Sequence, residues 1–248
     1  MNEMYVSGRN PVMELLKSEK QIDKLYVLKG DVKGSINKIM GIAKDRGIVI
    51  QQVDKTKLDS MSENRAHQGV VALVTGYEYS SVKDIISLAK KKGEEPFLVI
   101  LDGIEDTHNL GAIVRTAECA GVHGIIIPKR RSAMVNQTVY KSSAGAVEHM
   151  KIAQVNNIAQ TMDELKKEGL WLYGADMDGK DVYYNTTLNG AIGLVIGGEG
   201  KGLSRLVKEK CDVIVNIPMK GKINSLNASN AATVLIFEVV RQSNENKK

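Results

Sequence analysis

The chain has 248 residues, of which 43% are hydrophobic and 25% are charged, which predicts one large or two modest soluble domains. Its formal net charge of +5 favours a polyanionic partner without requiring one. Two cysteines are too few for a disulfide scaffold and the four histidines lack metal-ligand spacing, so neither a disulfide framework nor a metal site is predicted.

The first part of the chain predicts a small α/β unit that ends near residue 76. Its expected strands are Ile22–Leu28, Ile48–Val53 and Gly69–Thr75, and its expected helices are Ser35–Arg46 and Lys55–Met61. In the first helix, Ile36, Ile39 and Ala43 recur at helical spacing, and Gly47 stands where a C-cap belongs. Residues 77–95 then predict a linker that contains one amphipathic helix, Val82–Lys92.

Residues 96–248 predict a second, larger α/β domain. Apolar strands alternate with helical stretches, which is typical of a parallel sheet covered by helices on both faces. The expected strands are Phe97–Leu101, Gly124–Ile127, Lys151–Gln154, Leu170–Gly174, Gly193–Ile196 and Val213–Ile217. The expected helices are Asn109–Ala120, Asn136–Ser142, Asn157–Lys167, Leu203–Lys208 and Asn227–Arg241.

The chain is expected to be cytoplasmic and to have no membrane partner. Residues 1–10 lack a basic start followed by an apolar run, so no signal peptide is predicted. The longest apolar runs, such as Phe97–Leu101 and Ala191–Ile196, are strand-sized and too short to span a bilayer. Cys119 and Cys211 lie in apolar segments and are predicted to be small buried side chains.

A glycine-rich loop, residues 197–202, follows one of the expected strands and precedes a helix. Ligands bind at such strand ends in open α/β sheets. A Walker A motif would need Ser or Thr after Lys201, where Gly202 stands, and the spacing also fails the dinucleotide fingerprint. The loop therefore predicts close backbone approach to a ligand, with one carboxylate, Glu199, projecting from it.

Two other stretches place polar residues at the starts of helices, and their local sequence leaves two interpretations open. Asn109, Ser225 and Asn227 can each be a helix cap, although two potential caps one residue apart suggest a second task for one of them. Arg115 lies beside the apolar stripe of its helix and can pair with Glu118 or serve a site.

Taken in order, the three stretches resemble the SpoU (TrmH-type) RNA 2′-O-ribose methyltransferases of the SPOUT superfamily. That family's pattern is Asn-x-Gly-x-x-x-Arg-Thr-Ala, then Gly-x-Glu-x-x-Gly, then Ile-Pro-Met…Ser-Leu-Asn, and residues 109–117, 197–202 and 217–227 match it. Residues 6–16, 68–73 and 143–149 are most similar to the bacterial 23S rRNA guanosine branch. Thr107 departs from the family's usual proline, which loosens the loop but removes no functional group.

The resemblance implies a function and a set of site residues. It implies transfer of a methyl group from S-adenosyl-L-methionine (SAM) to a ribose 2′-hydroxyl of a guanosine in large-subunit (23S) rRNA, or of an RNA in an assembling ribosomal subunit. The implied catalytic residues are Arg115, Asn109, Glu199, Ser225 and Asn227, and the implied SAM-binding residues are Gly197, Ile217 and Leu226. The resemblance also implies a C-terminal trefoil knot, a homodimer whose site is completed by both subunits, and an RNA-binding domain at residues 1–76.

Other functions remain open at this point. The same chemistry could act on tRNA or on another rRNA site, and a non-catalytic RNA-binding ribosome-assembly factor or a nucleotide-binding module is a weaker alternative. Two phenylalanines, one tryptophan and eight tyrosines argue against a base-stacking RNA platform. The basic triplet Lys129–Arg131 follows an expected strand end and is a candidate RNA contact, with a solvated loop as the alternative.

Overall fold

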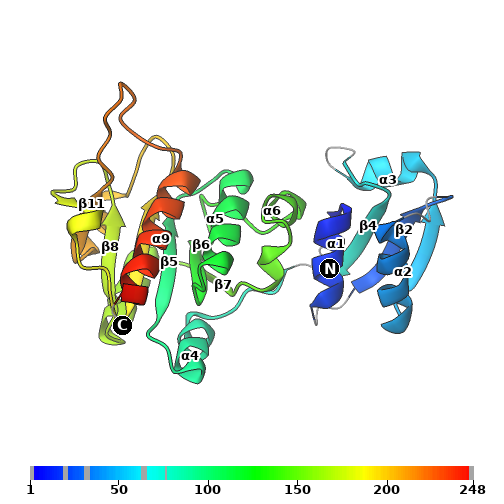
Figure 1. Cartoon of the computed structure of the whole chain (residues 1–248), viewed down its shortest axis with the longest axis horizontal. Helices are drawn as coiled ribbons and strands as arrows, with labels where there is room; N and C mark the ends of the chain where they lie inside the picture. The colour runs from blue at the N-terminus through cyan, green and yellow to red at the C-terminus, as the bar shows by residue number, and fades with distance from the viewer. Residues whose placement is uncertain (1–2, 19–21, 31–33, 63–65, 76, 246–248) are drawn as a thin grey trace. The chain divides into compact units, whose positions relative to one another are not determined.

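The structure is a computed structural model that describes residues 3–18, 22–30, 34–62, 66–75 and 77–245, and it divides the chain into two compact units (Figure 1). The N-terminal unit holds the chain up to Glu78 together with Val135–His149, and the C-terminal unit holds Tyr79–Met134 and the chain from Met150 onward. The boundaries predicted from the sequence assign residues 135–149 to the C-terminal domain. That segment instead packs with the N-terminal strands. The residues in contact are far apart in the chain, so local sequence patterns do not predict this packing.

The N-terminal unit is a mixed sheet with helices. Its strands are β1 (Glu3–Ser7), β2 (Ile22–Leu28), β3 (Val49–Val53) and β4 (Val70–Thr75). Its helices are α1 (Arg9–Lys17), α2 (Ser35–Asp45), α3 (Lys55–Met61), α6 (Gln137–Ser142) and the short 3₁₀ helix η1 (Ala146–Glu148). In the order β1-β4-β2-β3, β4 runs antiparallel to both neighbours and β3 runs parallel to β2. Strand β1 and helix α1 have no counterpart among the elements expected from the sequence.

The C-terminal unit is built on a sheet whose described strand pairs are all parallel, in the order β7-β6-β5-β10-β8-β11-β9. The strands are β5 (Phe97–Asp102), β6 (Gly124–Pro128), β7 (Ile152–Val155), β8 (Trp171–Ala175), β9 (Asp181–Val182), β10 (Ile192–Gly197) and β11 (Val213–Asn216). The helices are α4 (Val82–Lys92), α5 (Thr107–Cys119), α7 (Ile158–Lys167), α8 (Arg205–Lys210), α9 (Ala228–Glu245) and η2 (Tyr183–Asn185).

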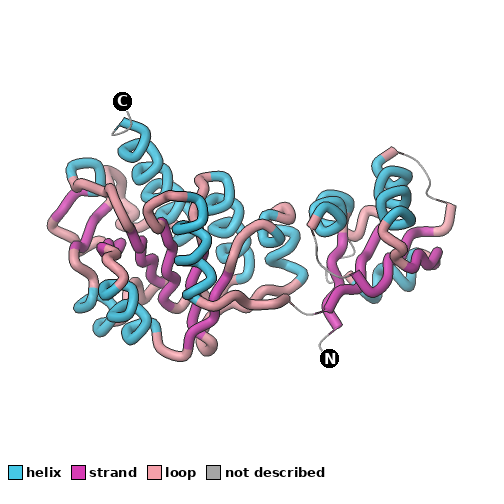
Figure 2. The backbone as a smooth tube through the Cα atoms, turned by 90° about the horizontal axis from the view of Figure 1, so that it is seen from below, coloured by secondary structure: helices cyan, strands magenta, loops and turns pink. Residues whose placement is uncertain are grey.

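Helices cover both faces of this parallel sheet, as the alternating pattern predicts (Figure 2). Apolar side chains of α4, α7 and α8, among them Ile85, Met162 and Val207, form one buried cluster with strand residues. Helices α5 and α9 pack against each other, and α9 also packs on β10. Burial on both faces explains why β5 and β10 read as continuous apolar runs rather than as alternating ones.

The two cysteines lie in different environments. Cys119 is exposed, so the prediction of a buried side chain is wrong for it: the buried stripe of α5 passes through Ile113 and Ala117, and Cys119 lies off that stripe. Cys211 is half-buried, its thiol donates to the carbonyl oxygen of Val207 at 3.3 Å, and burial raises the pKa of this thiol to about 12. The Cys211 thiol therefore stays protonated at neutral pH and is a poor nucleophile.

Within the described residues, no helix is long and apolar enough to cross a lipid bilayer.

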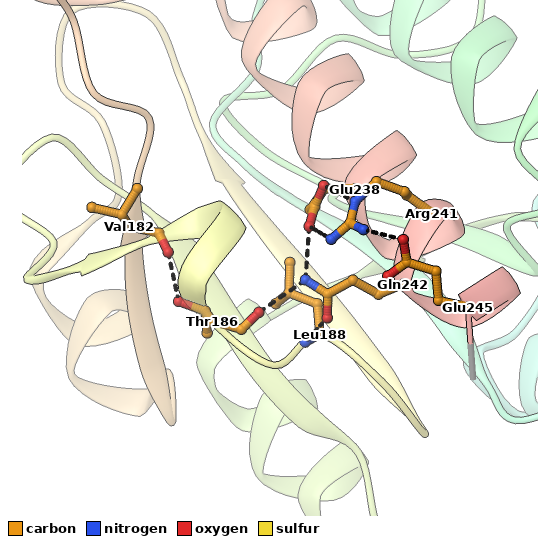
Figure 3. A network of polar contacts seen from close by, with 7 residues as sticks. All are labelled: Val182, Thr186, Leu188, Glu238, Arg241, Gln242 and Glu245. Carbon is orange, nitrogen blue, oxygen red and sulfur yellow. Dashed lines mark hydrogen bonds and ion pairs between the residues drawn. The ribbon is translucent and has the colours of Figure 1, made fainter.

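The end of α9 is fastened to the segment around η2 by a polar network (Figure 3). The Glu238 carboxylate is buried and accepts two hydrogen bonds from the Arg241 guanidinium, at 2.9 and 2.7 Å. Gln242 donates to Glu238 and to the carbonyl oxygen of Thr186, and it accepts from the backbone N–H of Leu188. The network thus connects the last turns of α9 to the chain that leads into β10.

The Arg241 guanidinium, through its hydrogen bonds, lowers the pKa of Glu238. A lowered carboxyl pKa contributes stability above the unfolded-state pKa, and that contribution is lost as the pH falls through the folded-state pKa. We expect Glu238→Gln to lower the melting temperature of the C-terminal unit by a few degrees at pH 7, and the difference from wild type to shrink below about pH 4. Calorimetry at pH 7 and at about pH 3 measures this, and an equal difference at both values would contradict it.

Candidate active site

Three loops at the carboxyl ends of neighbouring parallel strands enclose a cavity of about 790 Å³. They follow β8, β10 and β11, which lie side by side in the sheet. This edge is where ligands bind in open α/β sheets, and the volume lies in the range of small-molecule sites. The predicted site residues that line it are Gly197, Glu199, Ile217, Ser225, Leu226 and Asn227.

The loop after β10 is folded so tightly that side chains are excluded at two of its positions. A Cβ on Gly197 would overlap the backbone of Gly202 and Leu203, and one on Gly198 would overlap the carbonyl oxygen of Gly103. The N–H of Gly202 donates to the carbonyl oxygen of Gly198 at 3.0 Å, and Gly202 has a φ of +62°. The glycines therefore bring bare backbone to the cavity, as the sequence predicts.

Glu199 connects this loop to two helices. Its Oε1 atom accepts a hydrogen bond from Nδ2 of Asn109 and another, at 3.2 Å, from Nδ2 of Asn227. Asn109 is buried within α5, two residues after that helix begins, and Asp106 caps the helix through the N–H of His108. The interpretation of Asn109 as a plain N-cap is therefore wrong.

Asn227 has two tasks, whereas Ser225 caps nothing. The Oδ1 atom of Asn227 accepts from the N–H and the hydroxyl of Ser229 at the start of α9, while its Nδ2 atom reaches Glu199. Ser225 and Leu226 are exposed on the cavity wall and are thus accessible to a ligand. Of the two neighbouring candidates, only Asn227 acts as a helix cap.

Arg115 lies apart from these residues. Its side chain is exposed and does not line the cavity, although its helix, α5, carries Asn109. It makes no hydrogen bond or ion pair with any residue that the structure describes, so the possible pairing with Glu118 is absent. The chain therefore brings Asn109, Glu199 and Asn227 together but leaves Arg115 outside the group.

The loop after β8 also lines the cavity, and sequence reasoning missed it. Asp176, Met177 and Asp178 come from this loop. Asp176 is held by an ion pair with Lys208 at 2.9 Å, and this interaction raises the pKa of the Lys208 ammonium. The signal that could have found this loop is its position, because it leaves a strand at the same sheet edge as the two recognised loops.

The charged side chains on the cavity wall are mainly acidic, so the cavity can stabilise a cation. Three carboxylates, those of Asp176, Asp178 and Glu199, line it, with Lys201 as the only basic residue among the described lining residues. The described lining residues include no histidine or cysteine. Among the residues that the structure describes, no group of histidine, cysteine and carboxylate side chains could hold a metal ion.

Two family models together match most of the chain. Residues 96–237 match the SpoU rRNA Methylase family, and residues 5–80 match a domain described as RNA 2′-O ribose methyltransferase substrate binding.

The chain belongs to the SpoU family.

Relatives and solved structures agree with this assignment. YacO of Bacillus subtilis strain 168, which is named as a TrmH family tRNA/rRNA methyltransferase, is 48% identical over 97% of this chain and 96% of its own length. A Staphylococcus haemolyticus relative named for the same family is 45% identical over 99% of this chain and 98% of its own length. The SpoU methyltransferase AviRb of Streptomyces viridochromogenes, solved with SAM, is 25% identical with a TM-score of 0.82 over 97% of this chain and 90% of that one.

This SpoU family member is accordingly a SAM-dependent RNA 2′-O-methyltransferase, and the resemblance read from the three stretches is confirmed. The cavity fits the methyl donor. Bare glycine backbone leaves room that any Cβ at Gly197 or Gly198 would remove, and the carboxylates on the wall suit a molecule that carries a sulfonium and an ammonium group. SAM, when bound, supplies an electrophilic methyl group.

Proposed function

We propose that this SpoU methyltransferase modifies the ribose 2′-hydroxyl of a guanosine in 23S rRNA, free or within an assembling subunit, in the cytoplasm. The observation that carries the proposal is Glu199, whose carboxylate joins Asn109 and Asn227 at the wall of the cavity. A binding-only protein has no need for this arrangement beside a small-molecule cavity. Gly197, Ile217 and Leu226 would hold SAM through their backbone groups.

The length over which the structures of RNA methyltransferases align with this chain favours an rRNA target over a tRNA target. A tRNA-modifying TrmH/SpoU enzyme of A. aeolicus, 27% identical with a TM-score of 0.57, covers 66% of this chain, whereas an rRNA methyltransferase of Sinorhizobium meliloti, 22% identical with a TM-score of 0.79, covers 96%. The additional N-terminal residues match a substrate-binding model. In our proposal the N-terminal unit binds structured RNA and the C-terminal unit, which includes α4, forms a knotted catalytic domain.

Arg115 would orient the nucleophile rather than remove its proton. A guanidinium stays protonated far above neutral pH, so it cannot act as a general base. It can instead bind the adjacent phosphate and the 2′-oxygen and stabilise negative charge as it develops there. The proton would pass to the phosphate or to water, because the described cavity wall offers no histidine or cysteine and its three carboxylates are engaged by Asn109, Asn227 and Lys208. Ser225, Asn109, Glu199 and Asn227 would position the ribose and the guanidinium.

The exposed position of Arg115 supports a homodimer. Its guanidinium is unpaired among the described residues and does not line the cavity of its own chain, so a second copy would bring the two together. Other RNA targets, a tRNA or a different rRNA site, share the same chemistry and differ only in what the N-terminal unit binds. A non-catalytic assembly factor would have no use for Arg115.

Ribose-methylation mapping tests the target. Total rRNA and tRNA from cells that lack the gene are compared with RNA from cells that carry it and from cells that carry Arg115→Ala. We expect one 2′-O-methylguanosine in 23S rRNA to disappear in the first and third strains. Loss of a tRNA site would move the function to the tRNA alternative, and no lost site in any RNA would favour the assembly-factor alternative.

A further inference from the structure

A second cavity, of about 610 Å³, lies against the other side of the glycine loop. The two cavities share the wall formed by Gly198, Glu199, Lys201 and Gly202. The loops after β5 and β6 and the starts of α7 and α8 form the rest of the second wall. A ligand bound there would therefore be separated from the methyl-donor cavity only by the loop that carries Glu199.

Three cations line this second cavity, and none of them is neutralised by the described part of the protein. Arg130, Arg131 and Lys201 make no hydrogen bond or ion pair with any described residue. The arginines are exposed, so they can reach a ligand without first breaking an internal contact. Unpaired guanidinium groups in a concave wall attract anions, and their planar donors suit phosphate oxygens.

Four carboxylates also line the cavity, and three of them accept hydrogen bonds, each through one oxygen atom. Asp102 accepts from the N–H of Ser204 at 2.7 Å, and Asp106 accepts from the N–H of His108 at 2.7 Å. Glu199 accepts from two asparagines, and Glu105 is exposed. Three of the four carboxylates thus accept from backbone or amide N–H groups rather than from the cations of the wall.

The loop that carries the arginines is held in one conformation. Arg131 has a φ of +54°, a left-handed conformation that is unfavourable for a non-glycine residue. Its neighbours fix it: the N–H of Ala133 donates to the carbonyl oxygen of Ile104 at 2.7 Å, and the N–H of Lys129 donates to that of Val155 at 2.9 Å. Strained backbone conformations of this kind cluster at functional sites, where they fix the position of a side chain.

We propose that this second cavity binds the RNA backbone next to the ribose that is methylated, with Arg130, Arg131 and Lys201 contacting its phosphodiesters. The proposal rests on the proposed function and extends it to the path of the RNA strand. A strand anchored here would place the neighbouring ribose at the wall that bears Glu199. The start of α7 at Asn157 and Ile158 adds the positive end of a helix dipole to the same wall.

The three residues of the basic triplet Lys129–Arg131 look alike in the sequence, but they differ in their position relative to the cavity. Arg130 and Arg131 line it, whereas the adjacent Lys129, which is also exposed, does not. Lys129→Ala is therefore a matched control for the double variant Arg130→Ala/Arg131→Ala, because both remove positive charge from the same loop. If RNA is attracted only by the general positive charge of the loop, each removed charge should weaken RNA binding by a similar factor. If the cavity is a phosphate subsite, the double variant should lose much RNA affinity and Lys129→Ala should lose little.

Binding of in vitro transcribed 23S rRNA, measured over a range of salt concentrations, tests the proposal. We expect the double variant to bind at least tenfold more weakly and to lower the salt slope by about 1.4 to 1.8, as loss of two phosphate contacts requires. Lys129→Ala should change affinity less than threefold. SAM affinity and melting temperature should match wild type in both variants, which shows that the fold is intact.

Equal RNA affinities and salt slopes for the double variant and Lys129→Ala would overturn the subsite. Inorganic phosphate serves as a second probe: if it displaces RNA at the phosphate concentration at which an oligoribonucleotide does, the cavity takes free phosphate and the backbone assignment is wrong. The binding readout does not depend on turnover. A wild-type protein that binds RNA through these arginines but methylates none would contradict the proposed function and leave the subsite standing.

Discussion

Replacing Arg115 with alanine is expected to lower the single-turnover rate of methyl transfer by about 100- to 1,000-fold, the usual effect of removing one donor that stabilises developing negative charge. SAM affinity should stay within twofold, because Arg115 does not line the methyl-donor cavity. Stability should change little, since the side chain is exposed and has no described partner to lose. Single-turnover methylation of a 23S rRNA transcript, with SAM affinity and a melting curve, measures all three.

Two further variants define the role of Arg115. Arg205→Ala removes an equally charged side chain that is 90% exposed on α8, and it should leave the rate unchanged. Arg115→Lys retains the charge but loses the planar, two-pronged donor, so less than about a tenth of the rate should remain if geometry matters. A lysine variant with most of the wild-type rate would contradict the proposed geometry, because charge alone would then suffice.

Replacing Gly197 with alanine is expected to weaken SAM binding by about tenfold or more. The added methyl group would overlap the backbone of Gly202 and Leu203, and backbone cannot rotate away as a flexible side chain can. Overpacking of this kind costs about 1–3 kcal/mol and would shift the loop that lines both cavities. Isothermal titration with SAM measures the affinity, and a melting curve measures the accompanying loss of stability.

Gly221→Ala is the matched control for this prediction. Gly221 lies within residues 217–227, in the chain that follows β11, but a Cβ there would meet no atom within 4 Å, and its φ is not positive. The same glycine-to-alanine change should therefore leave SAM affinity unaltered. If Gly197→Ala bound SAM as well as Gly221→Ala, the tight glycine loop would not be what seats the methyl donor.

Much of the C-terminal unit could be predicted from local sequence. Buried parallel strands such as β5 and β10 are continuous apolar runs, and the glycine loop reads as close backbone approach because few other structures need so many glycines. Asn227 could be recognised as a cap from its position before a long helix. Its bond to Glu199 could not, because the two residues lie in different loops that only the folded sheet brings together.

The rest depends on contacts between distant residues. The packing of residues 135–149 with the N-terminal strands has no local signature. Helix α5 begins two residues before its predicted start, because Asp106 caps it. Asn109 therefore lies inside the helix, where its side chain donates to Glu199. The division of the basic triplet between a cavity wall and solvent depends on how one loop is held against another, which spacing along the chain does not encode.

The most direct test of the methyltransferase assignment is nucleoside mass spectrometry of RNA incubated with the purified protein and SAM that carries a deuterated methyl group. Transcripts of 23S rRNA and tRNA from the organism that encodes the chain serve as parallel substrates. We predict deuterated 2′-O-methylguanosine from the 23S transcript and none with Arg115→Ala. Label on a base, or no labelled nucleoside from either RNA at saturating SAM, would contradict transfer to a ribose 2′-hydroxyl.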